Sequence, residues 1–242
     1  MCVPMDVVVL SDAAAVADEA ARQVVALASS AIEARGRFTV ALSGGATPRA
    51  MHARLASTHR NDVDWSRVDF FWSDERAVPP DHPDSNFGMA RDTLLAPLAV
   101  RPERMHRMAG EDPDPAHAAG EYARELTSAL PGPVPLLDLV LLGMGTDGHT
   151  ASLFPNTPAL DVDDRFVVAN NAPQPPIERI TLTFPVLLAA HAVRVVVAGA
   201  GKAQTLATVL HGPSEPRQFP SQRLAGARGD LKWLVDAAAA RS

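Results

Sequence analysis

The chain has 242 residues, of which 47% are hydrophobic and 21% charged, which is enough to build one large globular α/β domain. Its formal net charge of −6 disfavours general binding to nucleic acid or to an anionic membrane surface. No apolar run reaches the ~18 residues of a membrane span, the N-terminus lacks the positive start of a signal peptide, and Cys2 is the only cysteine, so we expect a cytoplasmic protein without an internal disulfide.

Short apolar or β-branched runs predict the strands of the fold. They cover residues 6–10, 38–42, 68–72, 136–142, 166–169, 178–183, 193–198 and 231–235, with a further short strand near 105–108. Proline-rich stretches around residues 131–135, 170–176 and 213–220 are read as stiff connectors.

Helices are predicted between most of these strands. The first is an Ala-rich helix that Ser11 would cap and Gly36 would stop. The others are expected over residues 48–56, 87–95, 115–130, 184–190, from 202 onward, and 236–240. The alternation of strands and helices predicts a doubly wound, mostly parallel α/β sheet, and without repeats or a boundary it forms a single domain over residues 1–242.

The first candidate site follows the strand over residues 38–42. Ser43, Gly44, Gly45 and Thr47 form a loop between this strand and a helix that begins near Pro48. Backbone N–H groups and the helix dipole would favour a phosphate there. The alternative is an ordinary tight turn with Thr47 as the helix cap.

A second group of polar residues follows the strand over residues 68–72. Asp74, Glu75 and Arg76 stand at its end in a loop stiffened by prolines, and Asn86 lies at the start of the next helix. Arg76 is predicted either to pair with Asp74 at the surface or to bind an anion in the site.

The most informative stretch follows the apolar run over residues 136–142. Gly143, Gly145 and Gly148 surround Asp147 and His149, just past the carboxyl end of a buried strand, which is where open α/β sheets bind ligands. An acid and a histidine at this place predict a reaction centre, against the alternative of a glycine turn with solvated side chains.

The same glycines formally match the dinucleotide fingerprint GxGxxG. That fingerprint requires a helix after its third glycine, but Pro155 and Pro158 would cut such a helix short. A third strand–glycine–helix junction lies at residues 199–202, where Lys202 opposes the helix dipole, a local conflict typical of functional sites.

Four segments together resemble the 6-phosphogluconolactonase family. They are LSGGATP at residues 42–48, WSDER at 72–76 with DSN at 84–86, LGMGTDGHTASLFP at 142–155, and ERITLT at 178–183. Their order and spacing cover nearly the whole chain. Glucosamine-6-phosphate deaminases share the fold and the DGH motif, but this chain has Leu153, Phe154 and Pro155 where they carry the Asn-Glu-Pro that supplies their ring-opening glutamate.

The resemblance implies hydrolysis of 6-phospho-D-glucono-1,5-lactone without a metal or organic cofactor. We expect His149 to be the general base, Asp147 to orient it, and Arg76 to stabilise the oxyanion or to hold the substrate. The phosphate would meet the Gly44, Gly45 and Thr47 amides and the charges of Arg179 and Lys202. Ser43, Asn86, Gly143 and Gly145 complete the expected substrate-binding set.

Two alternatives remain beside the lactonase. One is a glucosamine-6-phosphate deaminase or isomerase, and the other is a phosphosugar-sensing domain that binds without turnover. The only partner expected is the small phosphosugar lactone, with no nucleic acid or membrane, and the protein is expected to be a monomer or a weak homo-oligomer.

Overall fold

The structure is a computed structural model that describes residues 6–241, and Cys2 lies outside this range. Its centre is a parallel sheet with the order β1-β9-β8-β5-β2-β3. The bounds of these strands are β1 Asp6–Leu10, β2 Phe38–Leu42, β3 Val68–Trp72, β5 Leu139–Gly143, β8 Ala192–Val197 and β9 Asp230–Asp236. The predicted doubly wound, mostly parallel α/β fold is confirmed.

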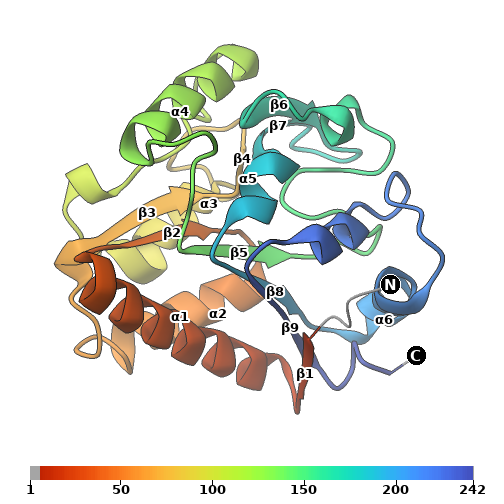
Figure 1. Ribbon diagram of the computed structural model, residues 1–242, viewed down its shortest axis with the longest axis horizontal. Coiled ribbons are helices and arrows are strands. Elements are labelled where there is room, and N and C mark those ends of the chain that lie inside the picture. The colour runs from red at the N-terminus through yellow and green to blue at the C-terminus, as the bar shows by residue number, and fades with distance from the viewer. Residues whose placement is uncertain (1–5, 242) are drawn as a thin grey trace.

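The helices are α1 Ala13–Arg35, α2 Ala46–Ser57, α3 Asn86–Ala90, α4 Pro115–Ala129, α5 Phe184–Ala189 and α6 Ala203–His211. Figure 1 shows α1 and α2 together on one side of the sheet, with α4 and α5 on the other. Trp72, Trp233 and Phe38 are fully buried between these layers, and every residue of β2 and β3 is buried, as expected of strands covered on both faces. No helix within residues 6–241 is long and apolar enough to cross a membrane.

A second sheet, which was not predicted, lies beside the first. It is antiparallel, with the order β4-β7-β6, and its strands are β4 Asp74–Arg76, β6 Val167–Asn171 and β7 Glu178–Leu182. The expectation that residues 73–83 form only a loop, and that all strands join one sheet, was therefore wrong. Ser73 connects the two sheets: its N–H donates to the Leu42 carbonyl, and its carbonyl accepts from the Leu182 N–H.

Three local predictions were also wrong. Asp12, not Ser11, caps α1, because the Asp12 carboxylate accepts the Ala15 N–H. Residues 105–108 make only an isolated bridge from Met105 to Phe70, and the chain after Asp236 forms turns instead of a helix.

The topology creates one point at which the chain leaves the sheet in opposite directions. From β2 the chain continues outward to β3, whereas from the neighbouring β5 it continues to β8 on the other side. The loops after β2 and β5 therefore separate and leave a crevice at the carboxyl ends of these strands. Such a switch point is where α/β sheets bind their ligands.

Candidate active site

A cavity of about 530 Å³ lies at this switch point, a size suited to a small metabolite. Its walls come from the ends of β2 and β5, from β4 and β7 of the second sheet, and from the loop that joins β6 to β7. Predicted residues that line it are Ser43, Gly44, Arg76, Asn86, Gly143, Gly145, Asp147, His149, Arg179 and Lys202. Gly45 and Thr47 are not among the lining residues.

Asp147 and His149 form a direct hydrogen bond. The Asp147 Oδ1 atom lies 2.6 Å from Nδ1 of His149 and also accepts the His149 backbone N–H at 3.1 Å. Since the carboxylate takes the Nδ1 hydrogen, the lone pair of the neutral imidazole lies on Nε2. Burial alone would raise the pKa of Asp147, but the hydrogen bonds and the charge of His149 outweigh it and lower that pKa.

Glycine at position 145 is required by this pair. A Cβ atom there would lie 2.1 Å from Nδ1 of His149 and 2.5 Å from Oδ1 of Asp147, so any side chain would push the pair apart. On its other side the His149 ring packs on Phe154, with the ring centres 4.4 Å apart. The imidazole is therefore held by a hydrogen bond and by an aromatic contact before any substrate arrives.

The loop that carries this pair is tied down from the C-terminal part of the chain. Thr205 on α6 donates to the Thr146 carbonyl at 2.6 Å, and the Ser221 N–H donates to the Gly148 carbonyl at 2.9 Å. Gly148 has a φ of 80°, and a Cβ there would lie 2.9 Å from the Phe219 ring. Residues 149–157 form turns and irregular backbone, so the helix that the dinucleotide fingerprint requires directly after Gly148 is not formed.

Two arginines stand opposite each other at another part of the cavity. Arg76 on β4 and Arg179 on β7 are directly paired across the antiparallel strands. Buried N–H groups of both side chains, Nε of Arg76 and an Nη of Arg179, have no hydrogen-bond partner within residues 6–241. Burial and the charge of Arg76 lower the pKa of Arg179. Like charges at such a pair are destabilising unless an anion joins them.

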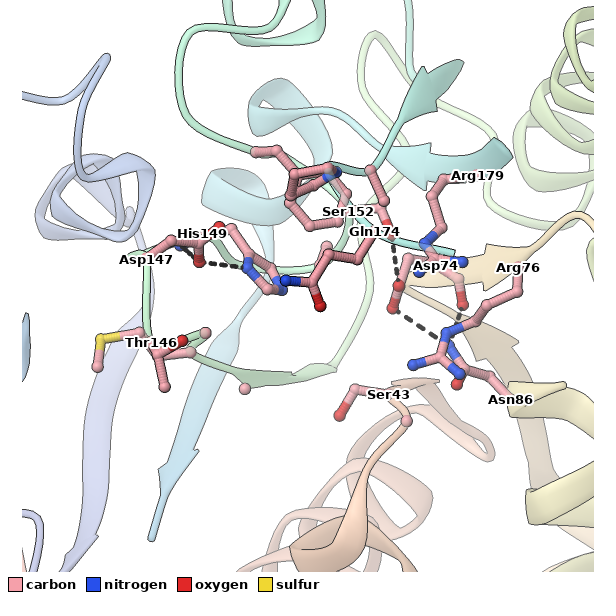
Figure 2. Close-up of a pocket in the computed structure, with 18 of the residues that line it drawn as sticks. Ser43, Asp74, Arg76, Asn86, Thr146, Asp147, His149, Ser152, Gln174 and Arg179 are labelled. Carbon is pink, nitrogen blue, oxygen red and sulfur yellow. Dashed lines mark hydrogen bonds and ion pairs between the residues drawn. The ribbon is translucent and has the colours of Figure 1, made fainter. Parts of the chain in front are cut away.

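Arg76 does not form the surface ion pair with Asp74 that was one of its two predicted roles. One of its Nη atoms instead donates to the Asp84 carbonyl at 2.6 Å. The Asp74 carboxylate is buried and accepts the Ser152 hydroxyl at 2.7 Å. Figure 2 shows this polar cluster with the arginines, apart from the Asp147–His149 pair.

Glu75 has a structural part in the same segment. Its buried carboxylate accepts the backbone N–H groups of Arg76, Asn86 and Phe87, each at 2.7 Å. Burial raises the pKa of Glu75 in spite of these bonds. The carboxylate fixes the start of α3, which places the Asn86 side chain against Gly44, where a Cβ would lie 1.9 Å from Oδ1 of Asn86.

The loop after β2 leaves donors free toward the cavity. No side chain caps α2, whose first flanking residue is Gly45 with a φ of 110°. The buried Ser43 hydroxyl lines the cavity and has no partner within the described residues. Thr47 is therefore not the cap of α2, which was the alternative to a binding loop.

Lys202 also lines the cavity and is its third cation beside the two arginines; burial lowers the pKa of its ammonium group.

Several residues line the cavity that were not predicted as site residues. Asp74 and Ser152 lie 78 positions apart in the chain, and only the junction of the two sheets brings them together. Thr146 and Phe154 also line the cavity; they lie within the quoted segment 142–155 but were given no role, and Gln174 had no motif to mark it. Within residues 6–241, no group of three or more His, Cys, Asp or Glu side chains is placed to hold a metal ion.

Comparison with known proteins agrees with this site. The chain matches the family model of glucosamine-6-phosphate isomerases/6-phosphogluconolactonase over residues 11–233. A 6-phosphogluconolactonase from Nostoc sp. is 45% identical over 212 residues, covering 86% of each chain. One from Streptomyces coelicolor is 40% identical over 245 aligned residues, covering 96% of this chain and 92% of the relative.

Solved structures agree as well. The 6-phosphogluconolactonase from Trypanosoma cruzi superimposes with a TM-score of 0.89 at 26% identity, covering 100% of this chain and 98% of that one. A monomeric glucosamine-6-phosphate deaminase also superimposes, with a TM-score of 0.79. Since the two sequences are only 22% identical, this likeness shows a shared fold and nothing about activity. The chain therefore belongs to the glucosamine-6-phosphate isomerase/6-phosphogluconolactonase family.

Proposed function

We propose that this protein hydrolyses 6-phospho-D-glucono-1,5-lactone to 6-phosphogluconate, the second step of the oxidative pentose phosphate pathway. The observation that carries the proposal is the arrangement of one cavity, in which a hydrogen-bonded Asp147–His149 pair and an arginine pair occupy different ends (Figure 2). A lactone with a phosphate at its far end needs these two features, and the names of the relatives support the same substrate.

His149 is the proposed general base. Nε2 takes a proton from a water molecule whose oxygen attacks the lactone carbonyl carbon, and Asp147 stabilises the imidazolium that forms. When the tetrahedral intermediate collapses, the bond from this carbon to the ring oxygen breaks. The ring oxygen then receives the proton back from Nε2 and becomes the free hydroxyl of the product.

The phosphate is proposed to bind between Arg76 and Arg179, close to Ser43 and Gly44. This position would satisfy the unpartnered N–H groups of both arginines and the free Ser43 hydroxyl. It would also place the dianion near the uncapped start of α2, where the helix dipole is favourable. The Asn86 side chain would support the loop after β2 by its contact with Gly44. Gly45 and Thr47 would contribute their backbone N–H groups at the start of α2.

Lys202 and the two arginines make this cavity rich in positive charge although the whole chain has a formal charge of −6. The field of these cations favours the phosphate and also the negative charge that develops on the carbonyl oxygen. Within residues 6–241, the Lys202 ammonium forms no ion pair; Asp236 acts on it only through its charge, and Lys202 lines the cavity, where it can meet a ligand.

The deaminase and the non-catalytic sensing domain are less well supported. The residues after the DGH motif are Thr150 to Pro155, without the glutamate expected of a deaminase. An oriented base with a free Nε2 would have no purpose in a domain that only binds. A cytoplasmic location and a monomeric or weakly homo-oligomeric state are further parts of the proposal that come from the sequence.

The experiment is a parallel assay on two substrates. Freshly made 6-phosphogluconolactone is followed by proton release, corrected for spontaneous opening, and glucosamine 6-phosphate is followed by ammonia release. Rapid lactone opening without ammonia is the expected result. Ammonia release would assign the protein to the deaminases, and binding of 6-phosphogluconate without turnover of either substrate would support a sensing domain.

A further inference from the structure

The segment that joins β6 to β7 forms one wall of the cavity. Ala172, Pro173, Gln174 and Pro175 all line it. The segment is closed by a hydrogen bond from the Ala172 N–H to the Ile177 carbonyl at 2.7 Å. Prolines at 173, 175 and 176 fix the backbone φ angles on both sides of Gln174. A side chain carried by such a segment starts from a well-defined position.

Gln174 is the one long polar side chain of this wall. Within residues 6–241, its amide forms no hydrogen bond with the protein, and the residue is exposed to the cavity. Figure 2 shows the side chain extending from the wall toward the His149 ring, into the space between this ring and the arginines. The amide is therefore placed where the body of a bound substrate would lie.

The Gln174 amide is a neutral group that is free to bind a ligand. The charged groups of the cavity are the cations Arg76, Arg179 and Lys202 and the acids Asp74 and Asp147. Its other amide, Asn86, already donates to the Asp74 carbonyl at 2.9 Å, whereas the Gln174 amide has no partner within the described residues. A neutral amide offers a donor and an acceptor side by side, which suits a hydroxyl group, since a hydroxyl both donates and accepts. A phosphate or a developing oxyanion is better served by the cations.

We propose that Gln174 is a specificity-determining residue that hydrogen-bonds the hydroxyl on the carbon next to the lactone carbonyl. The inference rests on the proposed function, because His149 then marks the position of the carbonyl carbon. The hydroxyl nearest to that carbon is the one on its neighbour, and the amide that extends toward His149 meets it first.

The test compares two lactones and three proteins. The substrates are 6-phosphogluconolactone and its 2-deoxy counterpart, and the proteins are the wild type, Gln174→Met and Gln204→Met. Methionine keeps the length of glutamine without its hydrogen bonds, and Gln204 is an exposed glutamine on α6 that does not line the cavity. The measured quantity is kcat/KM after subtraction of spontaneous hydrolysis.

We expect the wild type to prefer the hydroxylated lactone by about three- to tenfold, the usual contribution of one neutral hydrogen bond. Gln174→Met should lose this factor on the hydroxylated lactone and leave the 2-deoxy lactone unaffected, while Gln204→Met changes neither. Equal losses on both lactones, or no loss on either, would overturn the inference. A wild type that opens neither lactone would instead overturn the proposed function on which it rests.

Discussion

His149 and His106 both hydrogen-bond a carboxylate through Nδ1, but the surroundings of the two rings differ. His149 contacts Asp147 at 2.6 Å, and its ring borders the cavity. His106 contacts Glu125 at 2.9 Å through Nδ1, lies 3.6 Å from Asp69 through Nε2, and stacks on Phe71. One ring has a nitrogen free for a ligand, and the other has acids on both sides.

The difference separates a base from a structural cation. Although burial opposes protonation, the hydrogen bonds and charges of Asp69 and Glu125 raise the pKa of His106 to about 9, so it is charged at neutral pH. A charged imidazole has no lone pair to accept a proton from water. A carboxylate beside a histidine is therefore a weak sign of catalysis unless the second ring nitrogen faces a cavity.

Of the substitutions that test this difference between His149 and His106, Asp147→Asn is expected to lower the activity most. The amide cannot hold the Nδ1 hydrogen as the carboxylate does, so the imidazole loses its tautomer and the stabilisation of its charged form. We expect kcat on 6-phosphogluconolactone to fall by about 10²- to 10⁴-fold. Asp69→Asn, which alters the acid beside His106, should retain activity, and equal losses in the two variants would contradict the distinction between the pairs.

Gly145→Ala tests whether the geometry of the pair matters as much as its chemistry. The new methyl group would overlap Nδ1 of His149 and displace the ring. Displacement of a catalytic group by about 1 Å can cost 10²-fold, and we expect a loss of this order in kcat. Gly120→Ala is the control, because a Cβ there meets nothing within 4 Å. Unchanged kcat in Gly145→Ala would show that the observed pair is not needed.

Arg179→Met tests the end of the cavity opposite His149, where the phosphate is proposed to bind. Loss of a charge-assisted contact costs about 1.5–3 kcal/mol, which corresponds to a decrease in kcat/KM of roughly 10- to 100-fold on the phosphorylated lactone. Hydrolysis of unphosphorylated gluconolactone should be little affected, because no phosphate contact is lost. A similar loss on both lactones would place Arg179 at the carbonyl instead of the phosphate.

The smallest effect concerns stability alone. The pKa of His106 lies above its ordinary value near 6.5, so its charge stabilises the fold below about pH 6.5 and this contribution is lost as the pH rises toward 9. His106→Asn should lower the free energy of unfolding at pH 6 by at most about 3 kcal/mol. Urea unfolding of the wild type and the variant at pH 6 and pH 9.5 measures this difference in the free energy of unfolding. A difference of equal size at both pH values would mean that the lost stability comes from stacking on Phe71 and not from the charge of His106.

Much of the parallel sheet could be predicted from the sequence, because β2, β3, β5 and β8 are short apolar runs that only a buried strand explains. The second sheet could not. Asp74, Glu75 and Arg76 are polar and look like a loop. They form a strand because their backbone pairs with the distant strand β7, and because the buried Glu75 carboxylate finds local N–H donors.

The site was predictable to the extent that it is local in sequence. Asp147 and His149 stand two positions apart in one glycine-rich turn, so their pattern was visible, although their direct hydrogen bond was not. The meeting of Arg76 with Arg179, and the place of Gln174 beside His149, depend on how the second sheet packs against the first. Only the bracketing prolines around Gln174 could have drawn attention to it.

The most direct test of the central claim is the rate of 6-phosphogluconolactone hydrolysis by the wild type, His149→Asn and His106→Asn, with spontaneous opening subtracted. Circular dichroism of each protein would verify folding. We expect His149→Asn to lose about 10²- to 10⁴-fold in kcat and His106→Asn to keep the wild-type rate. An active His149→Asn protein would contradict the assignment of His149 as the base.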